Sequence, residues 1–359
     1  ETMPNITAPT RAGYTFQGYY SEKNGQGTKY YDASGNNLRY CDFYEKTTLY
    51  AYWNANPYEV NYDANKPETA SGSVKGSTGK SNHTYGTESP LSENKYTLEG
   101  WTFTGWATTP KGSVSYADGE KVTKLTTELN GKVTLYAVWK ANTYTVKYDG
   151  NKPGTTKNNV TGTTTDSTHT YDSLSTLSTN KYALEGYTFL GWATTSNGAV
   201  VYKDGEKVTN LTAEAGGTVT LYAVWKANTY TVKYDGNKPG TASAEVTGST
   251  ANSNFTYDDE YGVLSANGYS LTGWSFSGWA ATRDGEIIYK DGAVAKNLTA
   301  DADGIFTLYA VWQENEYTLS FNTDGGNFVN SVQVKYDNSL PSVTPPTRKG
   351  YNFKGYFSE

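Results

Sequence analysis

The chain has 359 residues, a formal net charge of −6 and a sequence pI of about 5.2, and Lys and Arg are concentrated nowhere along it. This pattern excludes the basic surface that binds nucleic acid or an anionic membrane, so we expect no nucleic-acid partner. A single cysteine, Cys41, excludes a framework of internal disulfides. We recognise no signal peptide and expect no membrane span within these residues.

The composition predicts a folded, β-rich protein. Charged residues make up 18% of the chain and the mean hydropathy is −0.68, yet 33 Tyr, 9 Trp and 11 Phe bring the aromatic share to 15%. Disordered chains are poor in aromatics. A few aromatic side chains bury enough area to build a small core, and Tyr, Trp, Val and Thr favour strands.

A repeat of about 86 residues organises the chain. The string LYAVW occurs at 135–139, 221–225 and 308–312, with LYAYW at 49–53, so the closing tryptophans are 86, 86 and 87 residues apart. GWATT at 105–109 and 191–195 and GWAAT at 278–282 keep nearly the same spacing. Fixed periods of this kind indicate tandem structural units. We predict three modules between two partial repeats: 1–53 (second half), 54–139, 140–225, 226–312 and 313–359 (first half).

Alternation of side chains predicts the strands within each module. Tyr144, Val146 and Tyr148 share one face of a first strand, which ends at a turn signal, residues 149–151. A central strand spans 101–106, and a closing strand spans 135–139. Thr-rich stretches around residues 125, 211 and 298 predict a helical turn, and therefore a minor α content in a β-rich fold.

Only four residues, 140–143, separate the predicted closing strand of one module from the first strand of the next. Such a link is too short to act as a free flexible tether. We therefore expect neighbouring modules to have restricted relative orientations and the tandem modules to form an elongated rod.

The two ends of the chain carry the same motif. PTRAGYTFQGYYSE at 9–22 matches PTRKGYNFKGYFSE at 346–359, an offset of 337 residues. Three interpretations stay open: a boundary inside a longer array, a super-repeat of that length, or pairing with another copy. In the last, the C-terminal half of one molecule completes the N-terminal half of the next, head to tail, by strand addition.

Several motifs occur in a fixed order: YTLSFNTDGGN at 317–327, PPTRKGYNFKGYF at 345–357 and TLYAYW at 48–53. In this order they resemble the Listeria–Bacteroides repeat, the internalin-type B repeat of bacterial surface proteins. The three full modules share GYTFLGWATT (186–195) and TLYAVW (220–225) with it. They differ by a longer Gly/Thr/Ser-rich segment after NKP and by KYALEGY (181–187) in place of the PTR element.

The resemblance implies a β-grasp-like fold and an extracellular position, on the cell surface or attached to the cell wall. It implies a non-catalytic stalk or spacer of a bacterial adhesin, with no catalytic residue, cofactor or metal. The alternative is a multivalent module that binds glycans, matrix proteins, or proteins on host or neighbouring cells.

Five tryptophans are candidates for stacking on sugar rings if they are exposed: Trp101, Trp106, Trp192, Trp274 and Trp279. Their strand alternation favours the other interpretation, in which they form the cores of the modules. Exposure of one aromatic at the same place in every module would favour binding, and burial would favour a spacer.

His83 and His169 are the only histidines, and both occupy a position where the third module has Phe255. A position that accepts His and Phe indicates a packed aromatic side chain, and no Cys or His cluster supplies further metal ligands. Cys41 is predicted to be an inert thiol.

The Asp residues that precede Gly stand almost alone in the sequence; they include Asp118, Asp149 and Asp204. Calcium takes six to eight oxygen ligands, commonly from a dense acidic loop, so we predict turns at these positions.

Overall fold

A computed structural model describes residues 1–358 as strands joined by turns and loops. The chain divides into two compact units. The first comprises residues 1–147, 165–178 and 205–220, and the second comprises 148–164, 179–204 and 221 onward. The β-rich class predicted from composition is confirmed.

The first unit begins with a three-stranded antiparallel sheet in the order β2-β1-β3. Its strands are β1 (Tyr14–Tyr20), β2 (Lys29–Tyr31) and β3 (Tyr50–Ala55), with a short 3₁₀ segment, η1 (Lys23–Gly25). The motif at 9–22 thus supplies a strand, and the LYAYW motif supplies its partner. This pairing joins residues 14–20 to residues 50–55, the two ends of the predicted partial repeat at 1–53.

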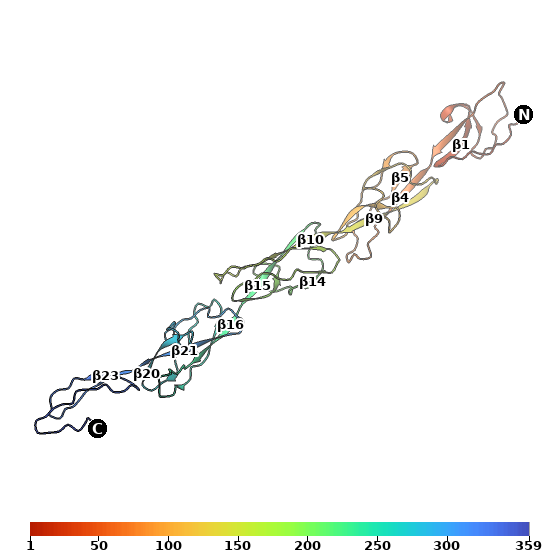
Figure 1. Cartoon of the computed structure of the whole chain (residues 1–359). Coiled ribbons are helices and arrows are strands. Elements are labelled where there is room, and N and C mark those ends of the chain that lie inside the picture. Colours follow the sequence, from red (N-terminus) through yellow and green to blue (C-terminus); the bar gives the residue numbers. More distant parts are fainter. Residues whose placement is uncertain (359) are drawn as a thin grey trace. The chain divides into compact units, whose positions relative to one another are not determined.

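The repeat at 54–139 lies within the first unit and contains a four-stranded sheet in the order β5-β4-β9-β7. Its elements are β4 (Pro57–Asp63), β5 (Ser81–Thr84), β6 (Ser89–Pro90), β7 (Trp101–Ala107), β8 (Lys121–Val122) and β9 (Gly131–Ala141). The closing strand β9 is central, parallel to β4 and antiparallel to β7. Figure 1 labels β4, β5 and β9 of this sheet. The motif TLYAVW therefore lies between two neighbouring strands, and its Leu135 and Ala137 side chains are buried.

Burial follows the alternation of the sequence. Tyr58, Val60 and Tyr62 of β4 pack with Leu135 and Ala137 of β9 in one apolar cluster, which also holds the indole of Trp106. Full burial of one large apolar side chain contributes about 1.5–3 kcal/mol relative to exposure. A few aromatics per repeat are thus enough to form a core.

A β-bulge interrupts the pairing of β7 with β9 between Phe103 and Gly105. Gly105 has φ +144, and a Cβ there would lie 2.5 Å from the Val114 side chain and 2.8 Å from the Tyr116 carbonyl oxygen. Only glycine fits this backbone without strain. The bulge explains why glycine precedes tryptophan in the GWATT motif.

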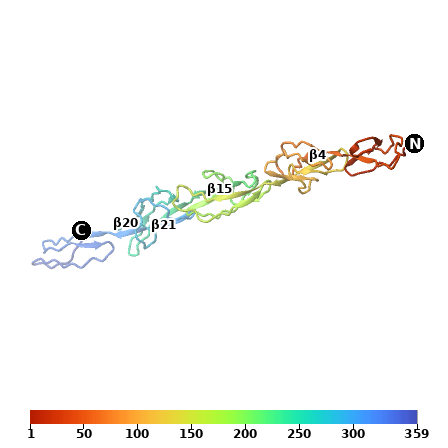
Figure 2. The same ribbon diagram turned by 90° about the horizontal axis from the view of Figure 1, so that it is seen from above.

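The second unit contains the repeat at 226–312, with a sheet in the order β18-β16-β21-β20. Its strands are β16 (Thr229–Asp235), β17 (Thr247–Gly248), β18 (Ser253–Thr256), β19 (Tyr269–Ser270), β20 (Trp274–Ala280) and β21 (Gly304–Glu314). Both views place β20 beside β21 (Figures 1 and 2). Trp279 is buried in the core of this repeat, as Trp106 is in the first.

The repeat at 140–225 contributes residues to each unit and carries the equivalent strands. These are β10 (Thr143–Asp149), β11 (Ser167–Thr170), β12 (Ser175–Thr176), β13 (Tyr187–Ala193), β14 (Lys207–Val208) and β15 (Thr218–Ala227). In the first unit β11 pairs with β10, so that His169 is opposite Tyr144. In the second unit β13 pairs with β15, so that Phe189 is opposite Trp225.

The last described strands are β22 (Glu316–Leu319) and β23 (Val332–Lys335), which form an antiparallel hairpin. Residues 351–358 form no strand, although they repeat the motif that forms β1. The related motif at 14–20 becomes a strand where β3 pairs with it, which indicates that pairing decides this structure more than local propensity does.

Two details differ from the sequence prediction. The helical turn expected around Leu125, Leu211 and Leu298 is wrong: these stretches form bends and turns, and η1 is the only helical element within residues 1–358. The link between repeats is also shorter than expected. Strand β9 continues to Ala141 and β10 starts at Thr143, so a single residue separates them.

Candidate functional site: the joints between repeats

Each link between consecutive repeats is one asparagine. It lies between β3 and β4, between β9 and β10, between β15 and β16, and between β21 and β22. The four linking residues are Asn56, Asn142, Asn228 and Asn315. We call each of these residues, with its hydrogen-bond partners, a joint.

The second joint lies within the first unit and holds Asn142 by both its backbone and its side chain. The Asn142 N–H donates to the Gly100 carbonyl (2.8 Å), and the Asn142 carbonyl accepts from the Tyr171 N–H (2.8 Å). The Thr102 hydroxyl donates to Asn142 Oδ1 (2.6 Å), and Asn142 Nδ2 donates to the Ala213 carbonyl (2.8 Å). One residue is thus bonded to the repeat before it and to the repeat after it.

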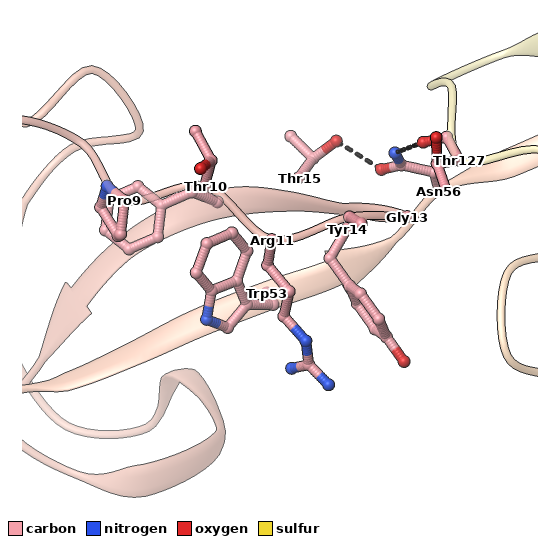
Figure 3. Close-up of a pocket in the computed structure, with 11 residues that line it drawn as sticks. Pro9, Thr10, Arg11, Gly13, Tyr14, Thr15, Trp53, Asn56 and Thr127 are labelled. Carbon is pink, nitrogen blue, oxygen red and sulfur yellow. Dashed lines mark hydrogen bonds between the residues drawn. The ribbon is translucent and has the colours of Figure 1, made fainter.

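The same side-chain bonds recur at the first and third joints. In the first joint Thr15 donates to Asn56 Oδ1 (2.6 Å) and Asn56 Nδ2 donates to the Thr127 carbonyl (2.8 Å), as the dashed lines of Figure 3 show. In the third joint, which lies within the second unit, Asn228 Nδ2 donates to the Ala300 carbonyl (2.7 Å). Asparagine suits this place because its amide both accepts and donates.

A tyrosine ring packs on a glycine at every joint. Gly100 has φ +72, and a Cβ on it would lie 2.1 Å from the Tyr171 ring, so any larger residue would displace the ring. The equivalent pairs are Gly13 with Tyr85, Gly186 with Tyr257 and Gly273 with Tyr336. The close approach of backbone and ring adds apolar contact to the polar contacts of the asparagine.

A carboxylate reinforces the second joint. Asp172 accepts from the Ser71 N–H (3.0 Å), the Ser71 hydroxyl (2.5 Å), Trp101 Nε1 (2.9 Å) and Asn210 Nδ2 (2.8 Å). Burial by itself would raise the pKa of Asp172, but these hydrogen bonds outweigh it and lower the pKa to about 2. Hydrogen bonds to an ionised acceptor are stronger than those between neutral groups.

In the third and fourth joints an aspartate at the equivalent position accepts hydrogen bonds from other partners. Asp258 accepts from the Tyr187 hydroxyl (3.1 Å) and Asn297 Nδ2 (2.9 Å). Burial tends to raise the pKa of Asp258, and the hydrogen bonds, with nearby Lys296, lower it on balance. Asp337 accepts from the N–H and the hydroxyl of Ser243 (3.0 and 2.7 Å).

An open pocket of about 570 Å³ lies beside the first joint (Figure 3). Arg11, Tyr14 and Trp53 line it, with the Arg11 guanidinium 3.8 Å from the centre of the Tyr14 ring. Arg11 is the one charged residue among the lining residues. The pocket therefore offers no pair of groups for general acid–base catalysis.

The structure separates the five candidate sugar-stacking tryptophans into two groups. Trp106, Trp192 and Trp279 are 0% exposed and pack in the repeat cores, so their rings present no face to a sugar. The reason is the alternation along each strand, which turns these indoles inward. Trp101 and Trp274 are half-buried. Trp101 belongs to the second joint through its bond to Asp172.

The two histidines are buried, as expected for a packed aromatic position. The His83 ring stacks on Tyr58 with centres 5.3 Å apart, and the His169 ring stacks on Tyr144 at 5.5 Å. In the third repeat Phe255 stacks on Tyr230 at the same 5.5 Å. Burial lowers the pKa of both histidines from its ordinary value.

The remaining candidates form no cluster. Cys41 is a free, exposed thiol. Gly119 and Gly205, after Asp118 and Asp204, have positive φ, and Asp149 Oδ1 accepts from the Asn151 N–H (2.7 Å), as in turns. Across residues 1–358 no three His, Cys, Asp or Glu side chains are grouped to hold a metal ion.

Prediction from the sequence missed the joint asparagines, because the stretch between two strands was treated as a linker. A signal was present: asparagine recurs at 56, 142, 228 and 315, with the same period as the closing tryptophans. A polar residue that returns with the structural period inside a linker indicates a contact that every repeat makes.

These features define a class: tandem all-β repeats whose shared elements are cores and joints. The sequence model of the Listeria-Bacteroides repeat domain matches residues 1–52, 58–138, 144–224 and 317–359. The chain belongs to this family. The matched ranges leave out the whole of the repeat at 226–312, in which the structure nevertheless shows the equivalent sheet order to the repeat at 54–139.

Curated relatives are considerably longer than this chain. A protein of Evansella cellulosilytica described as a Gly-rich membrane protein is 29% identical over 98% of this chain and 36% of its own length. Internalin H of Listeria monocytogenes is 32% identical over 40% of this chain and 22% of its own length. The chain spans about a third or less of each.

The solved structure of the Bacillus anthracis TIE protein matches with a TM-score of 0.23 and 13% identity, covering 75% of this chain and 52% of that one. Among the described residues, no helix has the length and apolarity needed to cross a membrane.

Proposed function

We propose that this chain is a non-catalytic spacer segment of a bacterial surface protein, in which the joints hold successive repeats in set orientations. The observation that carries the proposal is the one-residue link. Each joint asparagine is bonded to the repeats on both sides, and a tyrosine ring packs against the glycine beside it. A spacer needs resistance to bending, which free linkers do not give.

The position on the cell surface is supported by the relatives. The chain belongs to the Listeria-Bacteroides repeat family, and the matches include internalin H and proteins described as membrane proteins. Each repeat contacts mainly its neighbours, so the length of such an array grows with the number of repeats. In this proposal the number of repeats sets the length of the spacer, and the joints make it stiff.

Deletion of one period tests the spacer proposal. Removal of residues 143–228 places Thr229 directly after Asn142 and restores a joint from existing parts. We expect small-angle scattering to show a maximum dimension shorter by one repeat, with no gain in flexibility. The matched control removes residues 143–227 and leaves two consecutive asparagines, which should make the link flexible. Equal flexibility in the two deletions would contradict the proposal.

A second candidate function is sugar or protein binding, favoured by one observation. Trp101, Tyr187 and Trp274 occupy the same position in three repeats, and all three residues are half-buried. An aromatic at one place in each repeat could give avidity from weak sites. A glycan array probed with the whole chain and with the variant Trp101→Ala/Tyr187→Ala/Trp274→Ala tests it; binding that survives the three substitutions excludes these rings.

A further inference from the structure

The two buried histidines are close in the chain to the joint tyrosines. His83 and His169 each stand two residues before the tyrosine that packs on the joint glycine, Tyr85 and Tyr171. The strand that holds each histidine therefore ends at a joint. The N–H of each tyrosine donates to its joint asparagine: Tyr85 to the Asn56 carbonyl (2.9 Å) and Tyr171 to the Asn142 carbonyl (2.8 Å).

The surroundings of His169 suit a neutral ring. It is 1% exposed, Tyr144 of β10 stacks on it, and Nε2 contacts the Ser167 hydroxyl at 2.7 Å. Nδ1 is buried and has no hydrogen-bond partner among the described residues. A charged imidazolium donates from both nitrogens, so protonation would add a buried charge and an unsatisfied N–H.

Within residues 1–358, no charge that faces His169 compensates for this cost. Asp172, two residues beyond the end of β11, accepts hydrogen bonds from Ser71, Trp101 and Asn210. Asp166, directly before strand β11, is exposed. On the strands β12 and β14, Lys207 lies opposite Thr176. Burial alone lowers the pKa of His169.

Each ring nitrogen of His83 has a hydrogen-bond partner. Nε2 contacts the Ser81 hydroxyl (2.7 Å) and Nδ1 contacts the Ser89 hydroxyl (2.6 Å), so both nitrogens keep a partner after protonation. Tyr58 of β4 stacks on the ring. The charged groups nearby pair with each other: Glu59 of β4 with Lys80 (2.5 Å), and Glu88, next to β6, with Lys121 of β8 (3.7 Å).

The third repeat has no titratable ring at this position. Phe255 fills the position with the same stacking distance, and the nearby Ser253 and Ser265 hydroxyls bond to each other (2.8 Å). Phe255 also stands two residues before a joint tyrosine, Tyr257. The chain thus contains two joints next to a histidine and one matched joint without one.

We propose that His169, and more weakly His83, make the joints beside them releasable by acid, whereas the joint beside Phe255 does not respond over the same pH range. Acid opens strand β11, and the opened strand frees Tyr171 from Gly100 and Asn142. The inference concerns the joints themselves and does not need the spacer role to be correct.

Proton linkage sets the direction in which strand opening depends on pH. The pKa of each histidine is lower in the folded repeat than in the opened strand, so the opened strand binds protons more readily. The stabilisation is present above the ordinary histidine pKa of about 6.5 and is lost as the pH falls through the folded value. If the imidazole stays neutral while the strand that holds it is closed, that strand opens up to about 30-fold more often at about pH 5 than at about pH 8.

Hydrogen exchange of the whole chain, read by mass spectrometry at about pH 5 and about pH 8 and corrected for intrinsic rates, tests the proposal. We expect acid to deprotect residues 167–172 most, 81–85 less and 253–257 not at all. His169→Phe should remove the response at its joint, and Phe255→His should create one at the third joint. Equal responses in all three strands, or an unchanged response in His169→Phe, would overturn the proposal.

A measurement on the unsubstituted chain covers the case in which a variant fails to fold. NMR titration of the two imidazole rings should give apparent pKa values below about 6.5, with His169 lower than His83. A value at or above the ordinary one for His169 would overturn the proposal, because the folded repeat would then bind the proton at least as well as the open strand.

Discussion

Substitution of Asn142 by alanine tests the role of the joint side chain. The change removes the bond from Thr102 to Oδ1 and the bond from Nδ2 to the Ala213 carbonyl, and keeps both backbone bonds. Each hydrogen bond contributes about 0.5–1.5 kcal/mol, so the two together contribute about 1–3 kcal/mol to keeping the joint closed. That loss corresponds to opening about 5- to 150-fold more often.

Amide exchange at the joint measures this opening. We expect faster exchange at the Tyr171 N–H in Asn142→Ala and unchanged exchange in the core strand β4, which spans Pro57–Asp63 and does not adjoin the substituted residue. Asn197→Ala, at an exposed turn, is the matched control and should leave exchange at the joint unchanged. If the two variants exchange alike at Tyr171, the side chain of the joint asparagine does not hold the repeats together.

Three further predictions concern the core, the bulge and the joint carboxylate. Trp192→Ala should cost about 3–5 kcal/mol by leaving a cavity, seen as a lower unfolding midpoint; a smaller loss than Trp101→Ala causes would refute this placement. Gly105→Ala should cost about 1–3 kcal/mol from its backbone strain, measured by thermal melting against Gly79→Ala, where a Cβ meets nothing within 4 Å. Asp172→Asn should abolish the loss of joint stability that the unsubstituted chain shows as the pH falls from about 4 to about 2, because the carboxylate of the opened joint takes up its proton at a higher pH than that of the closed joint; amide exchange against pH measures it, and an unchanged acid profile would count against the carboxylate.

Much of each repeat could be predicted from the sequence, because its strands alternate strongly. Tyr144, Val146 and Tyr148 were expected on one face, and the structure buries all three. The packed aromatic position of His83 and His169 followed from the substitution of His by Phe between repeats. In each case the information is local or repeats with the period, so one sequence carries it.

The rest depends on contacts between distant residues. The parallel pairing of β4 with β9 joins segments more than seventy positions apart, and no local pattern specifies it. The bonds from Asn142 to Thr102 and Ala213 are similarly long-range, at separations of 40 and 71 residues. The helical turn around Leu125 was wrong because Thr-rich turns satisfy their backbone groups in other ways.

The distance distribution across one joint tests the central claim most directly. Nitroxide labels at Lys132→Cys on β9 and Thr168→Cys on β11, in a Cys41→Ser background, report on the two sides of the second joint by pulsed electron paramagnetic resonance. We predict one narrow distribution, which Asn142→Ala broadens. A broad distribution with the joint intact would show that the repeats turn freely about Asn142, and would contradict the account.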